Sequence, residues 1–125
     1  MTKLRELYRC TKCDNVIEIV HQGAPALVCC GEKMEQLEAQ TGDPNQQKHV
    51  PIVEEVDDGV EVVVGSTHHP MEEEHYIKFI EVLTADQVLR AELDVDQKPV
   101  VQFNVDKDEI VEVREYCNLH GLWKA

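Results

Sequence analysis

The distribution of cysteines restricts this chain more than any other feature of its sequence. Four of its five cysteines fall in residues 1–36, a segment too short to bury a hydrophobic core of its own. Segments of that size normally need disulfides or a bound metal to hold a fold. The first ten residues lack the apolar stretch of a secretory signal, so we expect a cytoplasmic protein with reduced cysteines. A metal site is therefore favoured over disulfides.

The spacing of these cysteines is that of a four-sulfur metal site. Cys10 and Cys13 have the C-x-x-C spacing that presents two sulfurs on one turn, and Cys29 and Cys30 follow to complete a tetrahedral set. Zinc and iron both accept four sulfurs, so the spacing does not choose between them. Because neighbouring side chains tend to diverge, the adjacent pair should distort the tetrahedron. A strained disulfide between Cys29 and Cys30, or buried free thiols, are the alternatives.

The rest of the chain has the pattern of an antiparallel β protein. Residues 37–48 are polar, contain Gly42 and the pair Asp43-Pro44, and indicate a linker. Later segments rich in β-branched and aromatic residues predict strands over 51–56, 60–64, 76–83, 100–105 and 110–116. Asp57-Asp58-Gly59 predicts a hairpin turn. We therefore expect a mainly β fold with an antiparallel sandwich. Residues 72–74, three glutamates, predict either one helical turn or an acidic loop.

A second group of candidate ligands is spread over this β-rich region. Its members are four histidines and one cysteine: His49, His69, His75, His120 and Cys117. Five donors are too many for a tetrahedral zinc site, but they suit a six-coordinate metal with one open position, and imidazole with thiolate fits iron. A thiolate ligand would push electron density onto whatever binds the open position, as it does in thiolate-ligated haem. His68 adjoins His69, and the spacing does not decide which of the two is a ligand.

The charge of the chain limits its partners. The chain has 12 Lys and Arg against 25 Asp and Glu, a net charge of −13. Nucleic acid and anionic membranes need a basic surface, so neither is an expected partner. No run approaches the roughly 18 apolar residues of a membrane span. The acidity also disfavours an anionic substrate.

Four motifs together indicate a family. They are the four N-terminal cysteines, Lys48-His49-Val50-Pro51, His69-Pro70-Met71-Glu72-Glu73, and Glu115-Tyr116-Cys117-Asn118-x-His120-Gly121-x-Trp123-Lys124. In these motifs the chain resembles the desulfoferrodoxins, the two-iron class of superoxide reductase, over essentially its whole length. The resemblance implies a desulforedoxin-like four-cysteine iron domain over 1–36, a linker over 37–48, and an immunoglobulin-like β-sandwich with a catalytic iron over 49–125. It also implies a homodimer.

The resemblance further implies a reaction and a ligand set. Four equatorial histidines and the axial Cys117 would hold the catalytic iron, with His69 and not His68 as the ligand. Superoxide would take one electron at the open position of the ferrous centre and leave as hydrogen peroxide. An external donor such as rubredoxin would reduce the iron again. The alternatives are a non-catalytic two-iron electron-transfer protein and a zinc-ribbon interaction module joined to a β-sandwich.

Two residues beside the open position complete the implied site. The family has a lysine there, matched by Lys48, and a glutamate immediately before it, where this chain has Gln47. In the family the glutamate closes over the ferric iron, and a neutral amide is a weaker donor, so we expect Gln47 not to close the site tightly. With Lys48 and a cationic iron nearby, and a Debye length of about 8 Å at physiological salt, the net acidity no longer disfavours superoxide. Glu115 and Asp106 are expected on the solvated surface.

Overall fold

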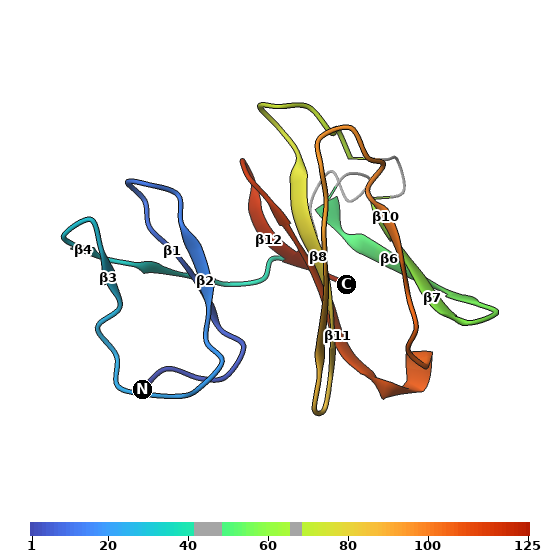
Figure 1. Ribbon diagram of the computed structural model, residues 1–125, viewed down its shortest axis with the longest axis horizontal. Coiled ribbons are helices and arrows are strands. Elements are labelled where there is room, and N and C mark those ends of the chain that lie inside the picture. Colours follow the sequence, from blue (N-terminus) through green and yellow to red (C-terminus); the bar gives the residue numbers. More distant parts are fainter. Residues whose placement is uncertain (42–48, 66–68) are drawn as a thin grey trace. The chain divides into compact units, whose positions relative to one another are not determined.

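The structure is a computed structural model, and it describes residues 1–41, 49–65 and 69–125 of the 125-residue chain. The chain divides into two compact units, Met1–Glu38 and Ala39–Ala125 (Figure 1). Gln47, Lys48 and His68 lie outside the described residues, so their predicted roles stay predictions. In the parts of the chain that are described, no helix has the length and apolar character needed to span a membrane.

The first unit consists of short strands and very little core. Its strands are β1 (Leu7–Arg9), β2 (Val16–Glu18), β3 (Val28–Cys29), β4 (Glu32–Lys33) and β5 (Glu35–Leu37). β1 pairs with both β2 and β5 in an antiparallel sheet, and β3 with β4 forms a separate hairpin. The buried hydrophobic side chains of this unit are Leu7, Cys10 and Ile19. So few buried groups cannot offset the entropy of ordering about 38 residues, so the unit needs a further constraint.

The second unit contains two antiparallel sheets. One has the order β10-β7-β6, and the other has the order β12-β11-β8-β9. The strands are β6 (Pro51–Val56), β7 (Gly59–Val64), β8 (Ile77–Thr84), β9 (Val88–Glu92), β10 (Val100–Phe103), β11 (Ile110–Cys117) and β12 (Gly121–Lys124). A 3-10 turn, η1 (Lys107–Glu109), precedes β11. The sequence pattern located five of these strands but not β9 and β12.

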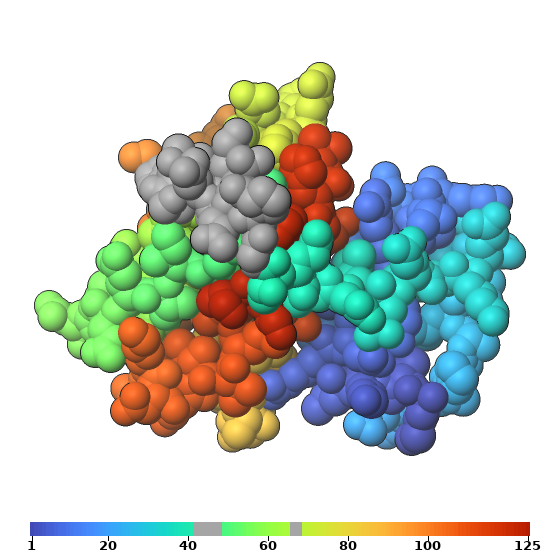
Figure 2. All heavy atoms as spheres, turned by 180° about the vertical axis from the view of Figure 1, so that it is seen from behind, coloured from blue at the N-terminus to red at the C-terminus, as the bar shows by residue number. Residues whose placement is uncertain are grey.

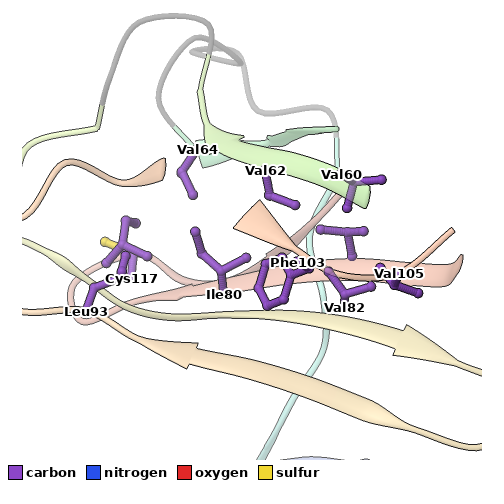
Figure 3. Close-up of a cluster of buried hydrophobic side chains, with 11 residues drawn as sticks. Val60, Val62, Val64, Ile80, Val82, Leu93, Phe103, Val105 and Cys117 are labelled. Atoms are coloured by element: carbon purple, nitrogen blue, oxygen red, sulfur yellow. The ribbon is translucent and has the colours of Figure 1, made fainter. Parts of the chain in front are cut away.

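The hydrophobic core lies between the two sheets. Val60, Val62 and Val64 alternate along β7 and are completely buried, as a period of two along a strand requires. They face Ile80 and Val82 of β8 across the core (Figure 3). The predictions of a mainly β chain, a small N-terminal unit and an antiparallel sandwich are confirmed. The immunoglobulin-like assignment stays a prediction.

The acidic segment before β8 is a tight turn and not a helical turn. The Glu72 N–H donates to the His75 carbonyl at 2.9 Å, and the His75 N–H donates to the Glu72 carbonyl at 3.1 Å. This reciprocal pair closes a loop of two residues, Glu73 and Glu74. The loop alternative for the three glutamates is therefore right, and the helical one is wrong.

Gly59 is required at the turn between β6 and β7, where Asp57 and Asp58 form the predicted two-residue loop. Its φ is +144°, and a Cβ there would collide with the Phe103 carbonyl oxygen and lie 3.0 Å from the Val105 nitrogen.

We expect Gly59→Ala to lower the free energy of unfolding by about 2–3 kcal/mol. Urea unfolding followed by Trp123, the sole tryptophan, measures this. The exposed neighbour variant Asp58→Ala should change it by less than about 0.5 kcal/mol, and equal effects would contradict the prediction.

Candidate metal centres

The four N-terminal cysteines converge. Their sulfur atoms all lie within 4.8 Å of one another. Cys10 directly follows β1, while Cys29 and Cys30 lie in the β3–β4 hairpin. The Sγ atoms of Cys13 and Cys29 are 3.5 Å apart, and those of Cys29 and Cys30 are 3.9 Å apart. A disulfide requires about 2.05 Å, so all of these cysteines are free thiols and the alternative of a vicinal disulfide is wrong.

Backbone geometry explains how two adjacent cysteines contribute to one cluster. Cys30 has a φ of +52° and Gly31 a φ of +76°, both in the left-handed region. A left-handed residue turns its side chain away from the alternation of an extended strand, so Cys30 does not point opposite to Cys29. This conformation is uncommon for a residue with a Cβ, and it overrides the expected divergence of neighbouring side chains.

The electrostatics of this cluster fit a bound cation. Hydrogen bonds from the backbone N–H groups of Cys13 and Lys12 lower the pKa of the Cys10 thiol to about 7. The neighbouring sulfurs of Cys13 and Cys10 raise the pKa of Cys30 to about 12. Four thiols at this distance cannot all ionise together unless a positive charge lies between them. A metal ion would provide that charge, and four sulfurs are ligands that iron and zinc accept.

The second group of predicted ligands also converges, although its members come from four separate loops and strand ends. The candidate donor atoms of His49, His69, His75, Cys117 and His120 all lie within 4.8 Å of one another. His49 Nε2 lies 3.0 Å from His120 Nδ1, and Cys117 Sγ lies 3.8 Å from the same nitrogen. The set presents four nitrogens and one sulfur to a common point. Five protein donors leave one position of a six-coordinate metal free.

His69 shows that this cluster is prepared for a metal. Its Nδ1 lies 2.7 Å from the Pro70 carbonyl oxygen, which accepts only if that nitrogen carries the proton. Its Nε2 then presents a lone pair, and this buried atom has no hydrogen-bond partner in the described residues. Burial lowers the pKa of His69 to about 4, so the ring is neutral at pH 7. A neutral imidazole whose second nitrogen is fixed by a carbonyl is the usual form of a metal ligand.

Cys117 supplies the one sulfur from inside the hydrophobic core. Its side chain is completely buried at the end of β11. Burial raises the pKa of the thiol, while the backbone N–H groups of His120 and Leu119 act in the opposite direction by donating to the sulfur. Those two N–H groups lie in the turn that also carries the His120 ring. The same turn therefore provides the His120 nitrogen and the hydrogen bonds to the Cys117 sulfur.

Two further residues hold the site together, and the sequence pattern did not reveal their roles. The Asn118 Oδ1 accepts from the Tyr76 N–H at 2.8 Å, and its Nδ2 donates to the Glu74 carbonyl at 3.0 Å. Asn118 thus joins the turn after Cys117 to the loop that carries His75. The Trp123 ring stacks on His49 with centroids 4.8 Å apart. Asn118 and Trp123 belong to the C-terminal motif, but the residues that they contact cannot be inferred from the motif alone.

Glu115 contradicts the expectation of a solvated surface residue. Its side chain is completely buried on β11, which places it opposite Ile80 and Trp123 on the neighbouring strands. Neither carboxylate oxygen has a hydrogen-bond partner within the described segments. Burial alone raises the pKa of Glu115 well above its usual value. Asp106, by contrast, is exposed as expected.

We expect Glu115→Met to stabilise the second unit. Replacing an unsatisfied buried polar group by an apolar one of similar size gains about 1–3 kcal/mol. The folded wild type keeps a proton that the unfolded chain releases above its usual pKa of 4.5, so wild-type stability falls as the pH rises through that value. The gain should therefore be larger at pH 7 than near pH 4.5. Urea unfolding of metal-free protein, followed by Trp123 fluorescence, measures it, and a destabilised variant would contradict it. The exposed control Glu109→Met should show no such gain.

Together, the fold and the two clusters define a mainly β metalloprotein with one four-sulfur centre and one centre of four imidazoles and a thiolate. The family model for the N-terminal domain of desulfoferrodoxin matches residues 2–37, and the desulfoferrodoxin model matches residues 41–125. The chain belongs to the desulfoferrodoxin family, and its two clusters match the two iron centres of that family.

Relatives and solved structures agree with this assignment. A desulfoferrodoxin homolog from Archaeoglobus fulgidus is 45% identical over 125 residues, which is 100% of this chain and 99% of that protein. The desulfoferrodoxin of Nitratidesulfovibrio vulgaris is 43% identical over 96% of this chain and 94% of its own length. The crystal structure of the superoxide reductase from Treponema pallidum matches with a TM-score of 0.76 and 31% identity, and covers 96% of this chain and 95% of that one. The chain is accordingly an oxidoreductase.

Proposed function

We propose that this chain is a superoxide reductase, which reduces superoxide to hydrogen peroxide at a ferrous centre and is reduced again by an external donor. The observation that carries this proposal is the convergence of four imidazole nitrogens and one thiol sulfur within 4.8 Å. The similarity to the Treponema pallidum superoxide reductase over 96% of the chain supports it. In this proposal the catalytic ligands are His49, His69, His75, His120 and Cys117.

The proposal divides the chain by task. Residues 1–36 form a desulforedoxin-like domain whose Cys10, Cys13, Cys29 and Cys30 bind one iron, and residues 49–125 form an immunoglobulin-like sandwich that holds the catalytic iron. Residues 37–48 link the two. The protein acts in the cytoplasm as a homodimer, with rubredoxin as the donor class. The boundaries of the two matching family models, 2–37 and 41–125, support this division.

The charges of the proposed site favour the binding of a small anion. When bound, ferrous iron supplies the single electron and the free coordination position that superoxide needs. The four imidazoles add no charge, because a neutral ring is the metal-binding form. Cys117 adds one negative charge and donates electron density, which favours electron transfer to a group bound at the free position. The site as a whole therefore keeps a net positive charge inside an acidic protein.

Lys48 and Gln47 have roles that follow from their place in the sequence beside His49. Lys48 attracts the anion and orders the water that delivers a proton to the reduced product. Gln47 does not close the site as the family's glutamate does, since an amide oxygen is a weaker donor for ferric iron. A resting ferric structure with a direct bond between the Gln47 oxygen and iron would overturn this role.

We expect Lys48→Ala to slow the capture of superoxide by about 10-fold or more at low ionic strength. The reason is the loss of the positive charge that, in this proposal, attracts the anion. The rate of the variant should also depend less on salt than the wild-type rate does. Pulse radiolysis at two salt concentrations measures both quantities. The remote variant Lys107→Ala is the control, and an unchanged rate in Lys48→Ala would contradict the steering role.

The reaction itself can be tested directly. Fully reduced, iron-loaded protein should consume superoxide in a fast bimolecular phase and yield one hydrogen peroxide per superoxide, with no dioxygen. An electron-transfer protein without catalytic function would show no such phase, and a zinc-ribbon module would contain zinc and show no visible colour. Either result would overturn the proposal. An iron count and visible spectra before and after oxidation, taken on the same sample, separate these two outcomes.

A further inference from the structure

The segment that ends the described residues 1–41 runs along the last strand of the sandwich. Gln40 pairs in parallel with Trp123 of β12. The Gln40 N–H donates to the Leu122 carbonyl at 2.9 Å, and the Lys124 N–H donates to the Gln40 carbonyl at 3.0 Å. In Figure 2 this turquoise segment lies against the red C-terminal residues. Gln40 is therefore held by its backbone as an additional edge residue beside β12.

The side chain of Gln40 reaches the backbone of a candidate ligand. Its Nε2 donates to the His120 carbonyl at 2.9 Å, and lies 3.4 Å from the Leu122 carbonyl. The Trp123 Nε1–H donates to the same His120 oxygen at 3.1 Å. Gly121 permits this approach, because it has a φ of +88° and a Cβ there would lie only 3.2 Å from the Gln40 nitrogen. Two donors thus converge on one carbonyl.

This contact matters because His120 is the exposed member of the five candidate ligands, whereas His49 and His69 are buried. A buried ring is positioned by the side chains packed around it, whereas the His120 ring meets other candidate ligands, with centroids 4.7 Å from His49 and 4.9 Å from His75. Outside the cluster itself, the backbone of its turn is what anchors His120. The hydrogen bonds to its carbonyl set the orientation of the turn that carries Nδ1 toward His49 and Cys117.

We infer that Gln40 is a positioning residue for the five-donor centre. Its amide anchors the His120 carbonyl and so keeps His120 Nδ1 at the point where the other four donors meet. Partners of this kind around a metal site typically change metal affinity 10–100-fold when they are lost. The inference rests on the ligand set of the proposed function, and it does not require superoxide to be the substrate.

The test compares iron release from the two centres of the same molecule. Gln40→Met keeps the length of the side chain but removes its N–H donor, and Gln40→Glu keeps the shape but presents only acceptors at neutral pH. Both variants should release iron from the five-donor centre to a ferrous chelator about 10-fold faster than wild type. Release from the four-cysteine centre should stay unchanged. The thiolate-to-iron absorption band and the reduction potential of the five-donor centre should also shift.

A matched control is the exposed Gln102, whose Nε2 makes a long contact of 3.4 Å with Glu61 on the same unit. Gln102→Met should leave iron release, absorption band and potential at their wild-type values.

Unchanged release and an unchanged band in both Gln40 variants would overturn the inference. Equal acceleration at both centres would also overturn it, because that pattern indicates general loosening of the fold. If Gln40→Met does not fold, the isosteric Gln40→Glu decides alone by the same criteria. A wild-type protein that binds iron at both centres but does not react with superoxide would refute the proposed function. The comparison of iron release between the variants would still test the role of Gln40.

Discussion

Substituting Cys117 by serine should abolish the five-donor iron centre while leaving the rest of the molecule folded. Serine has nearly the shape of cysteine, but its hydroxyl does not ionise near neutral pH and is a poor ligand for iron. We expect the iron content to fall from two ions to one per chain. Superoxide consumption should fall by at least about 100-fold, because losing a residue that only hydrogen-bonds to a metal ligand already lowers metal affinity or activity by up to about 100-fold. Metal analysis and pulse radiolysis measure the two effects.

The same variant carries its own control. The four-cysteine centre does not involve Cys117, so its absorption bands should persist in Cys117→Ser. Because Cys117 belongs to the sandwich core, the buried hydroxyl should cost about 1–3 kcal/mol of unfolding free energy. That loss is measured separately by urea unfolding. Retention of two irons with an unchanged superoxide rate would show that the thiolate is not a ligand.

Removing metal from the four-cysteine cluster should unfold the first unit and spare the second. The first unit has only Leu7, Cys10 and Ile19 as buried hydrophobic residues, whereas the sandwich has a continuous core. Metal binding free energy is folding free energy when no core exists without the metal. We expect hydrogen exchange in residues 1–38 to approach the rate of an unfolded chain after iron is chelated. Exchange in the strands of the second unit should stay slow.

Single substitutions in the same turn distinguish the metal from other contacts. Cys10→Ser removes a buried candidate ligand and should reproduce the effect of chelation. Lys12→Ser removes only the exposed ion pair with Glu32, whose atoms are 3.2 Å apart, and should change stability by less than about 1 kcal/mol. Slow exchange in residues 1–38 of the metal-free protein would show that this unit folds without its metal.

The parts of the fold that the sequence predicted are those governed by local rules. The hairpin of β6 and β7 follows from the alternation of Val60, Val62 and Val64 and from the turn at Gly59. β12 was missed because its sequence, Gly-Leu-Trp-Lys, contains no β-branched residue and does not alternate between apolar and polar side chains. The way in which the adjacent Cys29 and Cys30 reach one cluster was not predicted, since the left-handed backbone at Cys30 cannot be read from residue spacing.

The sequence by itself predicted the two groups of candidate metal ligands, because ligand chemistry depends on residue type and the C-x-x-C pair is local. Only the tertiary structure decided how those ligands are held. Gln40 and His120 are separated by 80 residues, and the contact between them exists because the segment at Gln40 pairs with β12. The burial of Glu115 likewise depends on which face of β11 meets the opposite sheet. Such contacts arise from strand pairing over long sequence separations, for which a single sequence contains no local pattern.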